Sequence, residues 1–248
     1  MTPQRKWIII CVVVVLCVWL LLDNLAIGSN FGRFVLSREW QSAPLTIIRL
    51  NTLYDYVETD DYLAGVHTPL TNLVESHGGR VPRVSAARFD ELCNSRTDWQ
   101  QVFVYEVDRG KDFSDLATSL RYRNLQSANA SILRDSVEIA IQAEWDLDYQ
   151  RSYLMLLMET QYADQADEVA SVIASTLEEH KELEVVLAEK TLTLTGKKNF
   201  DPNLISVISF VDINDLDSWL GSVTTQSEMA ILDGDLDQVQ AFLLTSLN

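Results

Sequence analysis

An alternation of apolar and polar side chains at residues 135–148, DSVEIAIQAEWDLD, constrains the fold more than any other stretch. One parity is apolar throughout: Val137, Ile139, Ile141, Ala143, Trp145 and Leu147. Apart from Ala140, the residues between them are polar. A period of two is typical of a strand with one face in a core and the other in water. The sequence therefore predicts a domain built on an antiparallel sheet or barrel.

Further strands and helices are expected after this one. A turn and the apolar stretch RSYLMLLMETQ at 151–161 predict a hairpin with the alternating strand. DQADEVASVIASTLEEH at 164–180 has helical spacing and predicts an amphipathic helix. In ELEVVLAEKTLTLTG at 182–196 the apolar parity changes at 188–190, which predicts a second hairpin with a tight turn.

The remaining segments complete an α+β domain. Other strands are predicted at 44–52, 98–108 and 203–213, and a short closing helix at 235–247. The stretches 52–80 and 110–134 are interpreted as insertions with some helix. No internal repeat is visible at solenoid periods, so a single domain is the simplest interpretation.

The N-terminus carries an apolar segment at residues 7–22, WIIICVVVVLCVWLLL, directly after two basic residues. The segment is short against the roughly 20 residues that usually span a bilayer. Tryptophans near both of its ends favour an uncleaved transmembrane helix, and a signal peptide cleaved at 26–28 is the alternative. With the basic residues on the inner side, residues 1–6 form a cytoplasmic stub and residues 23–248 are exported.

Charge and residue usage argue against several functions. A net charge of −17 is unfavourable for a surface that neutralises the phosphates of DNA or RNA. Cys93 is the only cysteine beyond the apolar segment, so no internal disulfide framework is expected. None of the three histidines has a second ligand at metal-site spacing, and no G-x-S-x-G motif supplies a nucleophile. We therefore expect no catalytic residues, metal or cofactor, and a binding or scaffold role. The enzyme alternative, an exported hydrolase, needs a nucleophile and a base near His67 or His77.

Two blocks of the sequence resemble a known family. GSNFGRFVLSREWQS, which opens a block at 28–50, and VEIAIQAEWDLDYQRSYLMLLMETQ with ELEVVLAEKTLTLTG, within 135–196, are similar to the ToxS family of bacterial inner-membrane regulatory cofactors, and also to VtrC-type bile-sensing partners. The resemblance implies a single-pass inner-membrane protein with a periplasmic domain. It also implies an N-terminal transmembrane helix followed by an incomplete, lipocalin-like β-barrel with helical insertions. Residues from about 197 to 248 are a C-terminal extension to that pattern.

In that family the barrel is completed by the periplasmic domain of a membrane-bound, ToxR-type winged-helix transcriptional activator, and the pair can bind bile salts. The resemblance thus implies a partner and an amphipathic ligand. The partner-binding residues are expected to be Trp40, Leu45 and Ile47. The ligand-lining residues are taken from the inward parity of the best strands: Ile139, Ile141, Trp145, Met155 and Leu157. These five residues equally suit an ordinary dry core. The alternative function is a self-contained periplasmic carrier or assembly factor unrelated to transcription.

Overall fold

The computed structural model describes residues 30–82, 84–93, 99–144, 148, 150–178, 180–196, 200–222 and 236–246. The predicted stub at 1–6, the predicted transmembrane helix at 7–22 and Trp145 lie outside these ranges. Within them, no helix has both the length and the apolar character needed to cross a membrane.

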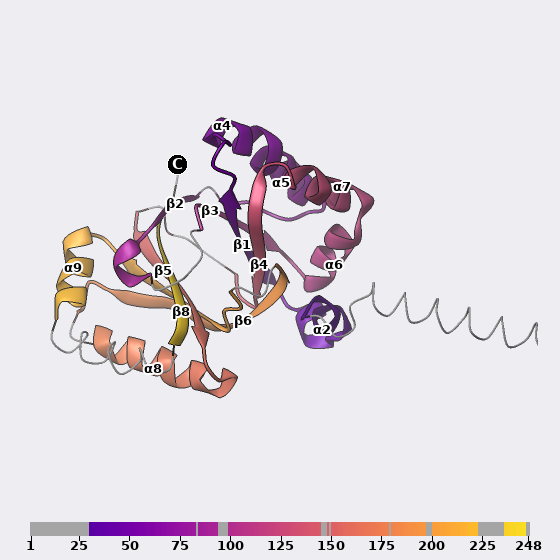
Figure 1. The fold of residues 1–248 in the computed structure, drawn as a ribbon. Helices are drawn as coiled ribbons and strands as arrows, with labels where there is room; N and C mark the ends of the chain where they lie inside the picture. Colours follow the sequence, from indigo (N-terminus) through magenta and orange to yellow (C-terminus); the bar gives the residue numbers. More distant parts are fainter. Residues whose placement is uncertain are drawn as a thin grey trace, which may run out of the picture.

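Eight strands of the described chain form one antiparallel sheet in the order β2-β8-β5-β7-β6-β4-β1-β3 (Figure 1). The strands are β1 (Leu45–Leu53), β2 (Val84–Arg88), β3 (Gln101–Val107), β4 (Leu133–Ile141), β5 (Ser152–Thr160), β6 (Glu184–Gly196), β7 (Leu204–Phe210) and β8 (Leu236–Ser246). The strands predicted at 44–52, 98–108, 135–148, 151–161 and 203–213 are confirmed as β1, β3, β4, β5 and β7.

The described chain contains the same arrangement of strands and helices twice. The first half runs β1, a helical segment of α4 (Thr59–Tyr62), the π-helix η1 (Leu63–His67) and α5 (Thr68–Ser76), then β2, β3, a pair of helices α6 (Gly110–Thr118) and α7 (Leu120–Asn129), and β4. The second half runs β5, α8 (Ala166–Leu177), β6, β7, α9 (Ile213–Gly221) and β8. Each half is therefore a βαββαβ unit of the ferredoxin-like type. The duplication has no visible counterpart in the sequence.

The two halves complete each other's sheets. β6 of the second half pairs first with β7 and then with β4 of the first half. Reciprocally, β2 of the first half pairs with β8 of the second. The sheet curls until its end strands β2 and β3 lie side by side, which makes a nearly closed barrel (Figure 1). In the described residues these two ends are joined by one bridge, between Arg80 and Glu106.

Three large apolar clusters hold the barrel and its helices together, and a small fourth cluster packs α4 and η1 against the sheet. The interior of the barrel is filled from both halves, with Leu50, Val137, Met155 and Phe242 among its members. The helix-facing side of the first half packs under α2 (Asn30–Leu36), α5 and α6, and that of the second half under α8 and α9. Each sheet half is thus covered on both faces, as a layered α+β fold requires.

The predicted pairing of neighbouring strands is wrong. β4 and β5 do not form the expected hairpin, because β4 pairs with β1 and β6 while β5 pairs with β7 and β8. The order of the strands also differs from that of an up-and-down barrel of the lipocalin kind, in which consecutive strands are neighbours. In a βαββαβ unit, two strands joined by a helix are not neighbours in the sheet, and β4 and β5 belong to different units, so closeness along the chain does not report the pairing.

The predictions for 182–196 and 235–247 are also wrong. The first segment is the single strand β6, with no turn at 188–190. Its parity changes because the register with β7 shifts between Val185 and Leu187, as at a β-bulge, and because the strand then passes to β4. The second segment is β8, not a helix. Phe242 of β8 lies in the barrel interior and Ala241 in the cluster under α8 and α9, so the continuous apolar run suits a strand covered on both faces.

The polar face of β4 is not in water. Glu138 on that face is 1% exposed and Ala140 is 0% exposed, because α6 and α7 cover it. The segments expected to be insertions are these covering helices and the α4–η1–α5 segment, which belong to the βαββαβ unit. Residues after 196 are likewise integral, because they supply β7, α9 and β8.

Candidate functional site

A buried ion pair joins the middle strands of the first half. Arg49 of β1 and Glu138 of β4 are directly opposite in the strand register. Their side chains are 0% and 1% exposed, and Arg49 Nη1 lies 3.4 Å from Glu138 Oε1. Arg49 is on the parity of β1 that faces the helices, beside Ile47, so the pair lies between the sheet and α7 and not inside the barrel.

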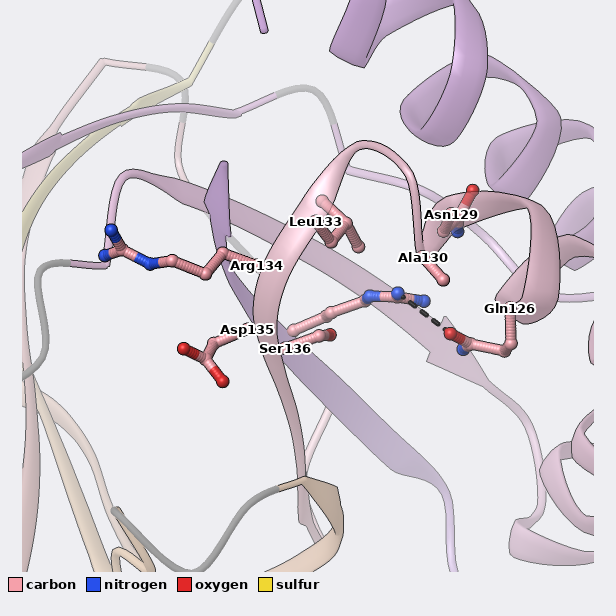
Figure 2. A pocket seen from close by; sticks show the side chains of 8 residues that line it. Gln126, Asn129, Ala130, Leu133, Arg134, Asp135 and Ser136 are labelled. Carbon is pink, nitrogen blue, oxygen red and sulfur yellow. Dashed lines mark hydrogen bonds between the residues drawn. The ribbon is translucent and has the colours of Figure 1, made fainter. Parts of the chain in front are cut away.

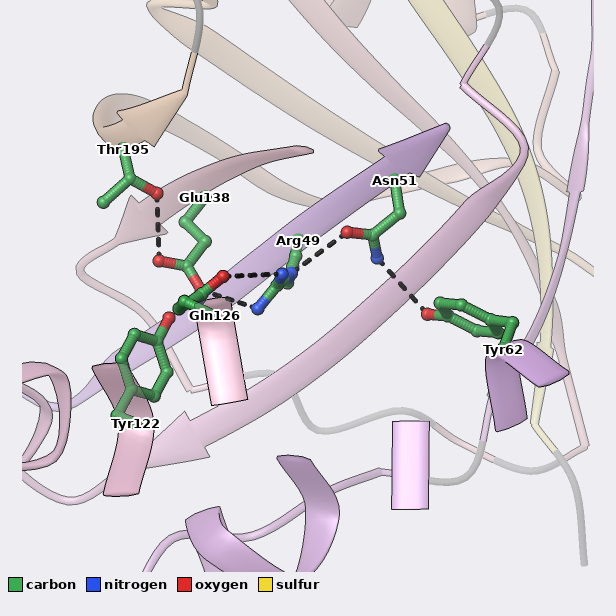
Figure 3. A network of polar contacts seen from close by, with 7 residues as sticks. All are labelled: Arg49, Asn51, Tyr62, Tyr122, Gln126, Glu138 and Thr195. Carbon is green, nitrogen blue, oxygen red and sulfur yellow. Dashed lines mark hydrogen bonds and ion pairs between the residues drawn. The ribbon is translucent and has the colours of Figure 1, made fainter. Parts of the chain in front are cut away.

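Neutral side chains hold the guanidinium of Arg49 in place (Figure 3). Arg49 Nε donates to Asn51 Oδ1 at 3.0 Å, and Nη2 donates to Gln126 Oε1 of α7 at 3.1 Å. Asn51 Nδ2 in turn donates to the hydroxyl of Tyr62 at the end of α4, at 3.3 Å. The π-helix η1 follows Tyr62 directly, and such turns are frequent at functional sites.

Hydroxyl groups hold the carboxylate of Glu138. The Tyr122 hydroxyl of α7 donates to Oε1, and Thr195 Oγ1 donates to Oε2 at 3.0 Å. Thr195 lies on β6, so the second half of the chain contributes one residue to this network (Figure 3). Glu138 therefore has two hydrogen-bond donors that do not depend on Arg49.

The pKa values in this network favour a cationic arginine and neutral tyrosines. Burial by itself lowers the pKa of Arg49, but the negative charge of Glu138 opposes it, and the net direction is upward. The pKa values of Tyr122 and Tyr105 are raised well above the usual 10.0, first by burial and then by Glu138. Tyr122 consequently stays a hydrogen-bond donor to the carboxylate at neutral pH.

A pocket of about 230 Å³ lies next to this network, between the end of α7 and the start of β4 (Figure 2). It is lined by Arg49, Gln126, Asn129, Ala130, Leu133, Arg134, Asp135 and Ser136. Arg49 Nη2 donates to Gln126 on one side of β4, and Figure 2 shows Arg134 and Asp135 on the other side of the strand. The buried arginine is thus the charged group on the α7 side of the pocket. A second pocket, of about 190 Å³, lies beside His180, Lys181 and Asp215 in the second half.

The second half has no counterpart of the ion pair. The register of β1 with β3 begins at Leu45↔Val107, and that of β5 with β7 at Ser152↔Phe210. Counting along the strands from these positions, Arg49 corresponds to Leu156. Glu138, opposite Arg49, corresponds to Ala241, which is opposite Leu156. Both counterparts belong to the apolar cluster under α8 and α9. The same fold therefore forms with an apolar pair at this place.

The predicted ligand-lining residues come together in the barrel interior. Ile139, Ile141, Met155 and Leu157 all belong to the interior cluster and are each 0% exposed. Trp145, the fifth, lies outside the described residues. Neither of the two pockets described above is lined by any of them. The structure thus gathers these residues as packed core side chains.

The predicted partner-binding residues lie in contacts within the chain. Leu45 and Ile47 are 1% and 0% exposed, in the cluster under the helices of the first half. Trp40 is half-buried on the short helix α3 (Arg38–Ser42), and its ring centroid is 6.1 Å from that of Phe34. The side chains of Leu45 and Ile47 therefore do not form part of the surface of this chain.

Sequence reasoning missed Arg49, Glu138 and Gln126. Arg49 is the only charged residue in the strand LTIIRLNTL, and a lone charge on an apolar strand is a usable signal. Glu138 carries no such signal, because it belongs to the polar face of its strand, which the sequence predicts to be exposed to water. Among the residues that the structure describes, no three His, Cys, Asp or Glu side chains lie close enough together to hold a metal ion.

Comparisons with known proteins identify the fold and no family. No family model and no curated protein matches the chain. Among solved structures, an anthrone oxidase-like protein aligns with a TM-score of 0.55 at 8% identity, over 83% of this chain and 92% of that chain. A candidate monooxygenase from Fusobacterium nucleatum subsp. nucleatum aligns at 0.47 and 12% identity, over 84% and 94% of the two chains. A candidate chlorite dismutase aligns at 0.45 and 12% identity, over 84% and 96%. At such identities, the likeness to the first of these concerns the fold alone.

Proposed function

We propose that this chain is a single-pass membrane regulatory cofactor, without enzymatic activity, that pairs with and stabilises a membrane-bound winged-helix transcription factor of the ToxR type. The sequence resemblance in the blocks at 28–50 and 135–196 is one support for the proposal. The structural observation that carries it is the seam between β2 and β3, the place where the barrel is least complete.

The seam offers strand edges to a partner. Arg80, four residues before β2, and Glu106 of β3 exchange two backbone hydrogen bonds, at 2.8 and 2.9 Å, and in the described residues the bridging at the seam is confined to this pair. Because backbone groups alternate along an antiparallel strand, Val102 and Val104 direct theirs to the same side as Glu106. An exposed strand edge is a template for pairing with another chain. Tethering of both proteins in one membrane would raise their effective concentration.

The proposal includes shared sensing of a bile salt or another amphipathic molecule. An eight-stranded barrel has an interior that side chains alone can fill, and the interior widens as strands are added. A partner strand inserted at the seam would therefore make room beside Ile139, Ile141, Met155 and Leu157, which are now packed together. In this proposal the ligand binds the pair of proteins and not the isolated chain.

Site-specific photo-crosslinking in the native membrane tests the proposal. A photoreactive residue replaces Ser85 or Ala87 on β2, both exposed, and Ser171 on α8, far from the seam, is the control position (Figure 1). We expect the β2 positions to crosslink to a one-pass protein with a cytoplasmic winged-helix domain, and Ser171 not to do so. Equal yields from all three positions, or no second protein from any of them, would contradict the proposal.

A second candidate function is a self-contained periplasmic carrier or assembly factor. The observation that favours it is the sheet itself, which reaches from β3 round to β2 within one chain. Purification of the full-length chain from its own membrane distinguishes the two candidates, because a carrier is recovered alone and a cofactor is recovered with its transcription factor.

A further inference from the structure

Four helices of the first half are basic in an otherwise acidic chain. Residues 30–42, which hold α2 and α3, and residues 109–129, which hold α6 and α7, contain six basic and three acidic residues, whereas the whole chain has a net charge of −17. The helix α9, which takes the place of α6 and α7 in the second half, contains Asp215 and Asp217 and no basic residue. Charge is therefore unequally divided between two copies of one fold.

These four helices form one packed group on the right-hand side of Figure 1. The ring centroid of Phe34 on α2 lies 5.6 Å from that of Phe113 on α6. Gln41 of α3 and Ser114 of α6 exchange side-chain hydrogen bonds at 2.9 and 3.1 Å, and α6 leads directly into α7. The basic residues of the group are thus carried by helices that contact one another.

Most cations of this group have no carboxylate partner. Arg33, Arg38, Lys111 and Arg121 are exposed. None of these four forms an ion pair within the part of the chain that the structure describes. Arg109, by contrast, is paired with an aspartate of its own helix. Cations that no neighbouring carboxylate neutralises remain available to an anionic surface.

Two leucines of the same helices are also exposed. Leu36 at the end of α2 and Leu120 at the start of α7 are 69% and 68% exposed. Leu36 follows Arg33 by three residues, so the two side chains share the outer face of α2. Exposed aliphatic side chains beside Lys and Arg are typical of helices that lie in the interface of a bilayer. We call the four exposed cations and these two leucines the basic face.

The place of the basic face along the chain favours a bilayer as its partner. The apolar segment predicted to cross the membrane ends at residue 22, and α2 begins at Asn30. Even at full extension, residues 23–29 span at most about 30 Å between these two points. An anchored chain therefore keeps α2 within reach of the lipid headgroups.

We propose that the basic face docks on an anionic bilayer, with its four cations at the lipid phosphates and its two leucines between the headgroups. The inference rests on the membrane anchor of the proposed function and is independent of the transcription factor. Docking would turn α8 and α9, which contain four acidic residues and no basic one, away from the bilayer, because they lie at the opposite side of Figure 1.

Photo-crosslinking to lipid tests the inference. The full-length chain is reconstituted in vesicles of phosphatidylcholine with or without phosphatidylglycerol, and a photoreactive residue replaces Leu36 or Leu120. Val211 and Tyr162, which are 66% and 64% exposed, are control positions of matched exposure in the second half. With phosphatidylglycerol present, we expect Leu36 and Leu120 to crosslink to lipid at least about fivefold more than the controls, and we expect this excess to shrink without it.

Two double variants separate docking from the effect of the tether alone. A tether keeps α2 near lipid whatever the surface charges are, whereas docking depends on them. In R33Q/R38Q we expect the excess crosslinking of Leu120 to be lost, because each cation near an anionic surface strengthens binding about fivefold. K181Q/K190Q, which removes two exposed cations from the second half, is the matched control and should crosslink as the native chain does.

Each outcome decides the question. Equal lipid crosslinking at all four positions of an anchored chain, or native crosslinking of Leu120 in R33Q/R38Q, overturns the inference alone. If R33Q/R38Q does not fold by circular dichroism, the comparison with and without phosphatidylglycerol decides, and equal yields overturn the inference. Capture of a protein instead of lipid by Leu120 in the native membrane overturns it as well. A chain that sodium carbonate removes from the vesicles has no anchor, and that result contradicts the proposed function together with the inference.

Discussion

Removing Glu138 should destabilise the protein more than removing Arg49. In Glu138→Ala, Arg49 remains 0% exposed without its countercharge, and breaking a buried pair in this way costs about 3–5 kcal/mol. The hydroxyls of Tyr122 and Thr195 also lose their acceptor, at about 1–3 kcal/mol for each donor left unsatisfied. Because these costs overlap, we expect a loss of about 5 kcal/mol in the free energy of unfolding.

Arg49→Leu should cost less. Glu138 keeps Tyr122 and Thr195 as donors, so its carboxylate stays hydrogen-bonded. The remaining losses are the hydrogen bonds to Asn51 and Gln126, which leaves a loss of about 2–3 kcal/mol. The double variant R49L/E138A should lie within about 1 kcal/mol of the native chain, since no charge is left buried and the second half packs the same pair of residues.

Urea unfolding of the four proteins, followed by tryptophan fluorescence, measures this cycle. The prediction is that the two single losses greatly exceed the loss in the double variant, which gives a coupling of several kcal/mol. Equal m-values across the four proteins are the control for a common unfolding transition. A double variant whose loss equals the sum of the two single losses would refute the reasoning, because the two residues would then contribute to stability independently of each other.

Three further outcomes are expected. Gly110→Ala should lose about 2–3 kcal/mol of stability in urea, because its Cβ would lie 2.0 Å from the backbone oxygen of Trp40, whereas Gly221→Ala, with nothing within 4 Å, should not. Burial and the adjacent carboxylate raise the pKa of Tyr122 well above 10.0, so the contribution of the protonated tyrosine to stability is complete below about pH 10 and is lost at higher pH. Tyr122→Phe should therefore unfold at a higher pH than the native chain in an alkaline titration. Burial lowers the pKa of His67 below 6.5, so stability should be complete above that pH and fall below it, and His67→Gln should reduce that fall in acid-unfolding curves.

The positions of the strands could be predicted from the sequence more reliably than the pairing between them. Alternation identified β4, and apolar runs identified β5 and β7, since side-chain patterns reflect which faces are covered. The pairing of β2 with β8 joins residues about 160 positions apart and leaves no local signal. The sequence predicts a helix where β8 lies, because a short apolar run such as QAFLLTS fits both a helix and a strand.

The candidate site could not be predicted because burial of a polar parity is decided by tertiary packing. Glu138 belongs to a polar face that one strand alone would expose to water, and α7 covers it only in the folded chain. Arg49 was visible as an isolated charge, but its partner is 89 residues away in the sequence. Of the predicted ligand-lining residues, the four that the structure describes lie together in the barrel, because they share the inward-facing apolar parity of their strands. Whether they bind a ligand stays a prediction.

The duplication within one chain has a consequence for how its binding surfaces can specialise. In a symmetric dimer every substitution occurs twice, once in each copy. Here the two halves are separate stretches of one polypeptide, so each can change independently. The first half carries a buried ion pair, while the second has apolar residues at the matching positions. Strand β6 of the second half also places Thr195 within hydrogen-bond distance of Glu138 in the first half. The two halves therefore share one backbone fold but can present different side chains to their surroundings.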